Sequence, residues 1–91
     1  MSGNDFSVVS IVSLPFQENT YVAWLPGRSD CVVVDPGLQP ELILNFLQNQ
    51  KLQPAIILNT HGHGDHIGGN GALKRAFPAA PLLIGRWHGW L

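Results

Sequence analysis

One short stretch of the chain gathers side chains that bind metal ions. The run Thr60-His61-Gly62-His63-Gly64-Asp65-His66 holds three of the four histidines in the sequence, together with one carboxylate. Side-chain packing does not explain why an ordinary loop would contain several histidines. The simpler alternative is a polar loop that contains them by chance. Imidazole nitrogen and carboxylate oxygen suit zinc, and also iron or manganese. The run predicts a metal site with zinc as the expected ion and with these ligands: His61, His63, Asp65 and His66.

The spacing of these ligands indicates more than one metal ion. Side chains two residues apart in an extended segment lie on the same side, so His61, His63 and Asp65 can converge, and the glycines between them add no bulk. His66 approaches from the following turn. Ligands this close in sequence would crowd one ion, which favours two pairs serving two metals about 3.5 to 4 Å apart. The run lacks the cysteines common in structural zinc sites, so a hydrolytic site with a position open for water is favoured.

The elements that must position this run can be read from the flanking sequence. The apolar stretch Ala55–Asn59 predicts a buried strand that delivers the run at its carboxyl end, where α/β sheets usually bind ligands. Helical spacing of apolar residues predicts one helix over Pro40–Gln50 and a second from about His66 or Ile67 to Phe77. The other predicted strands are Phe6–Ser13, Thr20–Leu25, Cys31–Val34 and Pro81–Gly85. The order β-β-β-α-β-α-β defines a mixed α/β fold.

Composition bounds the class of protein. A chain of 91 residues that is 45% hydrophobic and 12% charged predicts one domain or part of one, with apolar faces that further protein covers or that self-associate. A net charge of −1 with scattered basic residues argues against a nucleic-acid partner. The N-terminus lacks the pattern of a signal peptide or membrane span, and the lone Cys31 is expected to be a small buried hydrophobe. A reducing, cytoplasmic location without a membrane partner is therefore expected.

The motif resembles a known family. Residues 60 to 70 are similar to the H-x-H-x-D-H signature of the metallo-β-lactamase superfamily, and within it to the glyoxalase II-like (hydroxyacylglutathione hydrolase-like) hydrolases. Val34-Asp35-Pro36-Gly37 resembles the Asp-Pro-Gly turn that lies upstream in that family, and Phe16 to Val22 is a weaker similarity. The resemblance implies an αββα sandwich of which residues 1–91 are the N-terminal half, so the domain is expected to be incomplete.

The resemblance also implies a mechanism. In such a site His61 and His63 hold the first metal and Asp65 and His66 the second, while later segments supply the remaining ligands. The implied reaction is hydrolysis of a small-molecule thioester, such as an acylglutathione, by a metal-bound hydroxide. Asp65 is the candidate catalytic residue because it could orient or deprotonate the attacking water. The 91 residues alone are then expected to be inactive.

Other interpretations stay open on the sequence. The chain could be a non-catalytic metal-binding or interaction module, or part of an iron-dependent persulfide dioxygenase, an RNA-processing nuclease or a β-lactamase, which share the opening signature. Asp35 could be a turn aspartate or a support for the metal site. Surface or packing roles are expected for the remaining histidine and the tryptophans, which are His88, Trp24, Trp87 and Trp90.

Overall fold

A single mixed sheet organises the chain. The computed structural model describes residues 6–15, 17–60 and 69–84. Within these ranges the sheet contains five strands in sequence order, namely β1 (Ser7–Ser13), β2 (Glu18–Trp24), β3 (Asp30–Val34), β4 (Gln53–Asn59) and β5 (Leu82–Ile84). β1 with β2 and β2 with β3 are antiparallel, whereas β3 with β4 and β4 with β5 are parallel. The direction of pairing therefore changes at β3, in the middle of the sheet.

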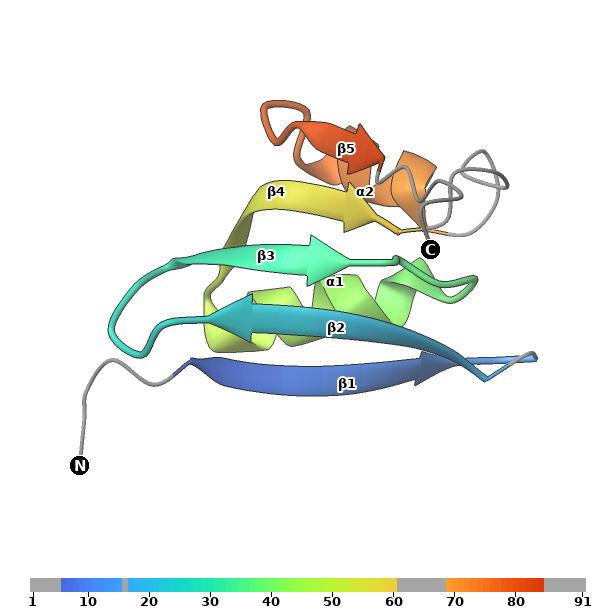
Figure 1. The fold of residues 1–91 in the computed structure, drawn as a ribbon, viewed down its shortest axis with the longest axis horizontal. Coiled ribbons are helices and arrows are strands. Elements are labelled where there is room, and N and C mark those ends of the chain that lie inside the picture. The colour runs from blue at the N-terminus through green and yellow to red at the C-terminus, as the bar shows by residue number, and fades with distance from the viewer. Residues whose placement is uncertain (1–5, 16, 61–68, 85–91) are drawn as a thin grey trace, which may run out of the picture.

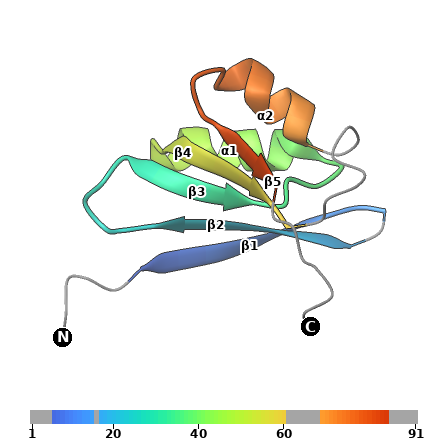
Figure 2. The ribbon, with the colours of Figure 1, turned by 45° about the horizontal axis from the view of Figure 1, so that its top comes forward.

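Two helices make the parallel crossovers. α1 (Pro40–Gln50) lies between β3 and β4, and α2 (Asn70–Ala76) lies between β4 and β5. α1 begins at Pro40, whose fixed φ suits a first helical position, with Glu41 near the positive end of the helix dipole. Both helices cover the same face of the sheet (Figures 1 and 2). Neither described helix has the length and hydropathy needed to cross a membrane.

The hydrophobic core lies between that face and the helices. Six aliphatic side chains with at most 1% exposure form its centre: Val22, Val33, Ile57, Ile43, Leu47 and Leu73. Full burial of one such side chain contributes about 1.5 to 3 kcal/mol. Trp24 packs against Phe46 of α1 with ring centroids 5.7 Å apart, which confirms its expected packing role. Cys31 is 3% exposed, and burial raises the pKa of its thiol to about 11, so it is the small buried hydrophobe that was expected.

The sequence-based elements agree with the structure in type and order, whereas some of their bounds differ. β2 begins at Glu18 instead of Thr20, and β4 begins at Gln53 instead of Ala55. The order β-β-β-α-β-α-β and the bounds of α1 are confirmed. The prediction that α2 begins near His66 or Ile67 differs from the structure, in which the helix begins at Asn70 and Gly69 is its N-cap. The Gly69 N–H bonds to the Pro36 carbonyl, so the turn upstream and not the helix takes up this donor.

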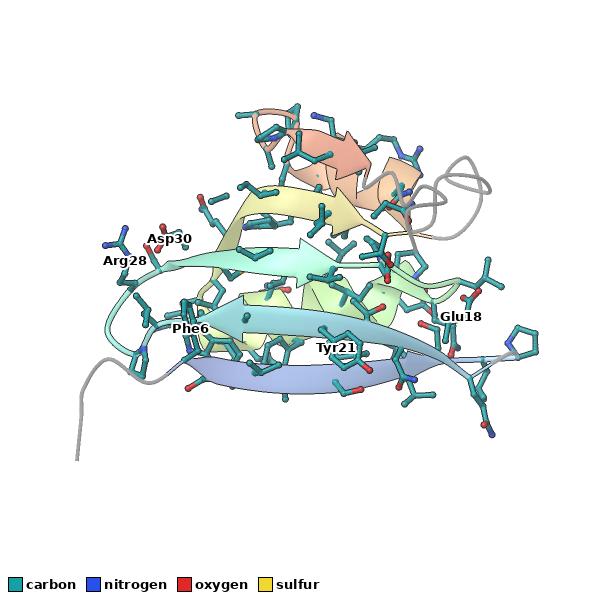
Figure 3. The ribbon with its side chains drawn as sticks, in the orientation of Figure 1. Phe6, Glu18, Tyr21, Arg28 and Asp30 are labelled. Carbon is teal, nitrogen blue, oxygen red and sulfur yellow. The ribbon has the colours of Figure 1, made fainter. Side chains whose placement is uncertain are left out.

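The second face of the sheet carries no helix among the residues that the structure describes (Figure 2). We call this second face the open face. Strand alternation and the register place these side chains on it: Val8, Ser10, Val12, Asn19, Tyr21, Ala23, Val32, Val34, Ile56, Leu58 and Leu83. These side chains are uncharged, and the same alternation places one charged residue on this face, Asp30 at the start of β3, which pairs with Arg28. Val8 is 60% exposed, Leu83 48% and Tyr21, which lies across the front of β2 in Figure 3, 42%. Away from Asp30 this surface is contiguous and uncharged, which is typical of a buried interface.

We expect the 91-residue chain to self-associate through the open face. Sedimentation velocity over a range of concentrations should show species larger than a monomer. Lysines in the double variant Val8→Lys/Val12→Lys would have to lose water on association, so this variant should shift the equilibrium toward monomer. The double variant Asn45→Lys/Asn49→Lys adds the same two charges at exposed positions of α1 and is the control. A parent chain that stays monomeric at every concentration would contradict the expectation.

Candidate metal centre

The predicted metal site follows β4 at the edge of the sheet where two parallel strands end. Val34, the last residue of β3, pairs with Leu58 of β4, and Thr60 directly precedes the histidine run. The four predicted ligands, His61, His63, Asp65 and His66, lie outside the described residues. The described part of the chain contains no other group of three or more His, Cys, Asp or Glu side chains placed to hold a metal ion. The ligand set therefore stays a prediction, and the structure shows how its flanks are held.

Asp35 connects the end of β3 to the start of the histidine run. Its Oδ1 accepts the Thr60 backbone N–H at 2.7 Å, and its Oδ2 accepts the Thr60 hydroxyl at 2.6 Å. Its own N–H donates to the Leu58 carbonyl at 2.8 Å, which links the same two strands once more. The sequence allows two roles for Asp35, a turn aspartate or a support for the metal site. In the structure it is a turn residue whose carboxylate holds the residue before His61.

The other end of the run is held by the same turn. The Gly69 N–H donates to the Pro36 carbonyl at 3.2 Å, and the Gly69 carbonyl accepts the Leu73 N–H of α2 at 2.9 Å. A Cβ on Gly69 would lie 2.7 Å from the Pro36 Cβ and 2.8 Å from the Gly37 carbonyl oxygen. Only glycine allows the two backbone segments to approach this closely. The φ of Gly69 is −89°, which any residue can adopt, so lack of space for a Cβ and not backbone conformation requires glycine here. The turn 35–37 thus holds both flanks of segment 61–68.

The turn itself is supported by the beginning of β2. Thr20, which is 0% exposed, donates its hydroxyl to the Asp35 carbonyl at 2.8 Å and accepts the Gly37 N–H at 3.1 Å. The Glu18 carboxylate accepts the Leu38 N–H at 3.1 Å. Figure 3 shows Glu18 at this end of the sheet, far from the exposed Arg28 and Asp30 ion pair at the opposite end. Polar groups from β2, β3 and β4 therefore meet around one turn.

Sequence reasoning missed the two β2 residues of this network. Thr20 begins the predicted strand Thr20–Leu25, where Thr is a common residue, and Glu18 lies before that strand with no evident partner. Their hydrogen bonds run to residues 17 and 20 positions later in sequence. Only the pairing of β2 with β3, which follows from the fold, brings them to the turn.

The fold and the site define a class of α/β protein in which parallel strands present a histidine-rich segment at the carboxyl edge of a mixed sheet. The chain belongs to the metallo-beta-lactamase superfamily, whose sequence model matches residues 14–91. The resemblance to this family and the predicted mixed α/β fold are thereby confirmed.

Named relatives are similar over the same region. A hydroxyacylglutathione hydrolase of Vibrio parahaemolyticus is 47% identical over 79 residues, which are 84% of this chain and 30% of that protein. The protein of the same name from Yersinia enterocolitica is 38% identical over 76 residues, 81% of this chain and 30% of its own length. The chain thus spans about 30% of the length of these curated relatives.

Solved structures have the same fold. The BLEG-1 B3 metallo-beta-lactamase superposes with a TM-score of 0.74 at 34% identity, over 84% of this chain and 35% of that one. ETHE1 from Myxococcus xanthus superposes with a TM-score of 0.72 at 22% identity, over 91% of this chain and 41% of that one. The second likeness concerns the fold alone.

Gly69→Ala should destabilise the protein by about 1 to 3 kcal/mol, because its Cβ would meet the rigid Pro36 ring and the Gly37 carbonyl. Chemical denaturation measures the effect. Gly71→Ala is the matched control, since a Cβ there meets only the far end of the flexible Arg75 side chain, at 3.4 Å. Alanine also favours the helix there by about 0.5 to 1 kcal/mol. Equal stability of Gly69→Ala and the parent would mean that the turn does not fix this flank.

Proposed function

We propose that the full-length protein carrying these residues is a metal-dependent hydrolase of the glyoxalase II type, which cleaves the thioester of an acylglutathione or a related small molecule. The main support is the turn 35–37, which holds both flanks of the segment that contains the H-x-H-x-D-H motif. Relatives named hydroxyacylglutathione hydrolase, at up to 47% identity, support the reaction class.

The donor set fits a pair of metal ions. His61 and His63 would hold one ion and Asp65 and His66 the other, with zinc as the proposed metal and iron or manganese as alternatives. The only thiol of the chain does not compete, because Cys31 is buried within the sheet and burial raises its pKa. Catalytic sites of this kind favour nitrogen and oxygen ligands over a closed shell of thiolates.

Residues of this chain would orient the reaction. When bound, such metal ions lower the pKa of coordinated water to about 7 and stabilise charge on a carbonyl oxygen. Asp65 would orient the attacking water or accept its proton. Asp35 acts at a distance from the substrate, because it fixes the Thr60 backbone that immediately precedes His61. Fixed backbone positions matter since metal and substrate geometry must hold to about 0.5 Å.

We further propose residues 1–91 as the N-terminal part of one larger domain, because the chain covers about 30% of the length of each named relative. Ligands that complete both metal shells would then come from other segments of that domain. The open face, uncharged apart from Asp30 at the start of β3, would be covered within the same domain.

The proposed activity is tested with the full-length protein and a hydroxyacylglutathione thioester. We expect metal-dependent hydrolysis that falls to the uncatalysed rate in His61→Ala, which removes a proposed ligand. His88→Ala removes the histidine outside the motif and should leave the rate unchanged.

Three outcomes would count against the proposal. Tightly bound metal without hydrolysis of any thioester would favour a non-catalytic metal-binding module. Iron content with oxygen uptake in the presence of a persulfide would favour the dioxygenase. Equal loss of rate in His61→Ala and His88→Ala would show that the activity does not depend specifically on the motif.

Substitution of Asp35 should distinguish the contribution of its left-handed backbone conformation from that of its carboxylate. Asn tolerates the left-handed φ of +57° and keeps one side-chain oxygen, so Asp35→Asn should be less destabilised than Asp35→Ala. Asp35→Asn loses one of the two carboxylate oxygens that bind Thr60, and Asp35→Ala loses both, so metal affinity should fall about 10- to 100-fold in each. Thermal melting of the metal-free protein and chelator competition measure the two effects. Unchanged metal affinity in Asp35→Ala would refute a supporting role for the carboxylate.

A further inference from the structure

We infer that Thr20 is a positioning residue for the metal-binding segment, although it lies on a different strand and outside the motif. The inference rests on the proposed function, since it concerns the same site. Thr20 is 0% exposed, and its hydroxyl donates to the Asp35 carbonyl at 2.8 Å while it accepts the Gly37 N–H at 3.1 Å. One hydroxyl therefore joins the two residues on either side of Pro36.

The turn needs such a bridge. Pro36 has no N–H to donate, and Asp35 adopts a left-handed conformation with φ of +57°, which non-glycine residues hold only where their surroundings fix it. The Leu58 carbonyl fixes the N–H of Asp35, and the Thr20 hydroxyl fixes its carbonyl. A hydroxyl can donate and accept at once, which no aliphatic side chain of the same shape can do.

The position of Thr20 is itself set by the sheet. Thr20 pairs with Ile11 of β1, and its neighbour Tyr21 pairs with Val34, the residue before Asp35. Its side chain points to the same face of the sheet as the core. The hydroxyl therefore has little freedom to follow the turn if the turn moves.

A change in this bridge would reach both flanks of the motif. Rotation of the Asp35 backbone would carry its carboxylate away from Thr60, and displacement of the Pro36 carbonyl would release the Gly69 N–H. The two flanks of segment 61–68 would then shift together. Metal sites tolerate such shifts poorly, because ligand geometry must hold to about 0.5 Å.

Three variants of the full-length protein test the inference. Thr20→Val keeps the shape and removes both hydrogen bonds, whereas Thr20→Ser keeps the hydroxyl. Ser13→Ala is the matched control: the Ser13 hydroxyl is also fully buried and lies beside Gly37, yet it has no hydrogen-bond partner in the described part of the chain. The three changes therefore separate loss of the bridge from loss of a buried hydroxyl in general.

Cobalt(II) is the probe, read by its visible absorption spectrum and by competition with a chelator. Thr20→Val should bind cobalt about 10- to 100-fold more weakly and with an altered spectrum. Thr20→Ser and Ser13→Ala should resemble the parent. If Thr20→Val loses stability in the metal-free form but keeps the cobalt affinity and spectrum of the parent, Thr20 has only a structural role. An equal loss of affinity in Ser13→Ala would also overturn the inference.

A measurement on the parent protein covers the case in which Thr20→Val does not fold. Coupling between two sites is reciprocal, so zinc binding must slow hydrogen exchange of the Gly37 amide if the bridge positions the zinc ligands. Unchanged exchange of this amide on zinc binding would overturn the inference. Metal binding is measured separately from thioester hydrolysis, so weakened cobalt binding in Thr20→Val supports the inference even if the parent hydrolyses no thioester.

Discussion

The hydrogen bonds between the Asp35 carboxylate and Thr60 determine the geometry of this end of the molecule. They join the residues that follow two neighbouring parallel strands, and both are short bonds to a charged acceptor. The backbone N–H and carbonyl of Asp35 are bonded as well, to β4 and β2 respectively. This set of contacts explains how a non-glycine residue holds a left-handed φ. Contacts with the sheet therefore fix Thr60, the residue directly before His61.

Mixed strand directions make this arrangement possible. β3 and β4 run parallel, so their carboxyl ends lie at one edge of the sheet. β2 runs antiparallel to β3, so the beginning of β2, with Glu18 and Thr20, reaches that same edge. In an all-parallel sheet the amino end of a neighbouring strand would lie at the opposite edge. The change of direction at β3 thus gives the turn support from both sides.

Much of this fold could be predicted from the sequence, because its signals are local. The apolar spacing and the proline at its start define α1 with correct bounds, and turn residues separate the first three strands. The start of α2 could not be predicted, because the Gly69 N–H bonds to a carbonyl 33 positions earlier. The motif identifies candidate ligands by type and spacing alone. Thr20 gives no such signal, since its role arises from contacts that only the folded sheet creates.

The two sides of the sheet and its motif-bearing edge are energetically connected. The helices bury one face of the sheet in a core of aliphatic side chains, and this burial supplies most of the favourable free energy of folding. The network around Asp35 contributes mainly hydrogen bonds, whose net contribution to stability is modest. The open face adds apolar burial only when further protein covers it. Local opening of β2 from β3 would remove Thr20 from the turn even where β3 stays paired with β4. Protein that covered the open face would therefore stabilise the pairing of β2 with β3, which holds Thr20 at the turn.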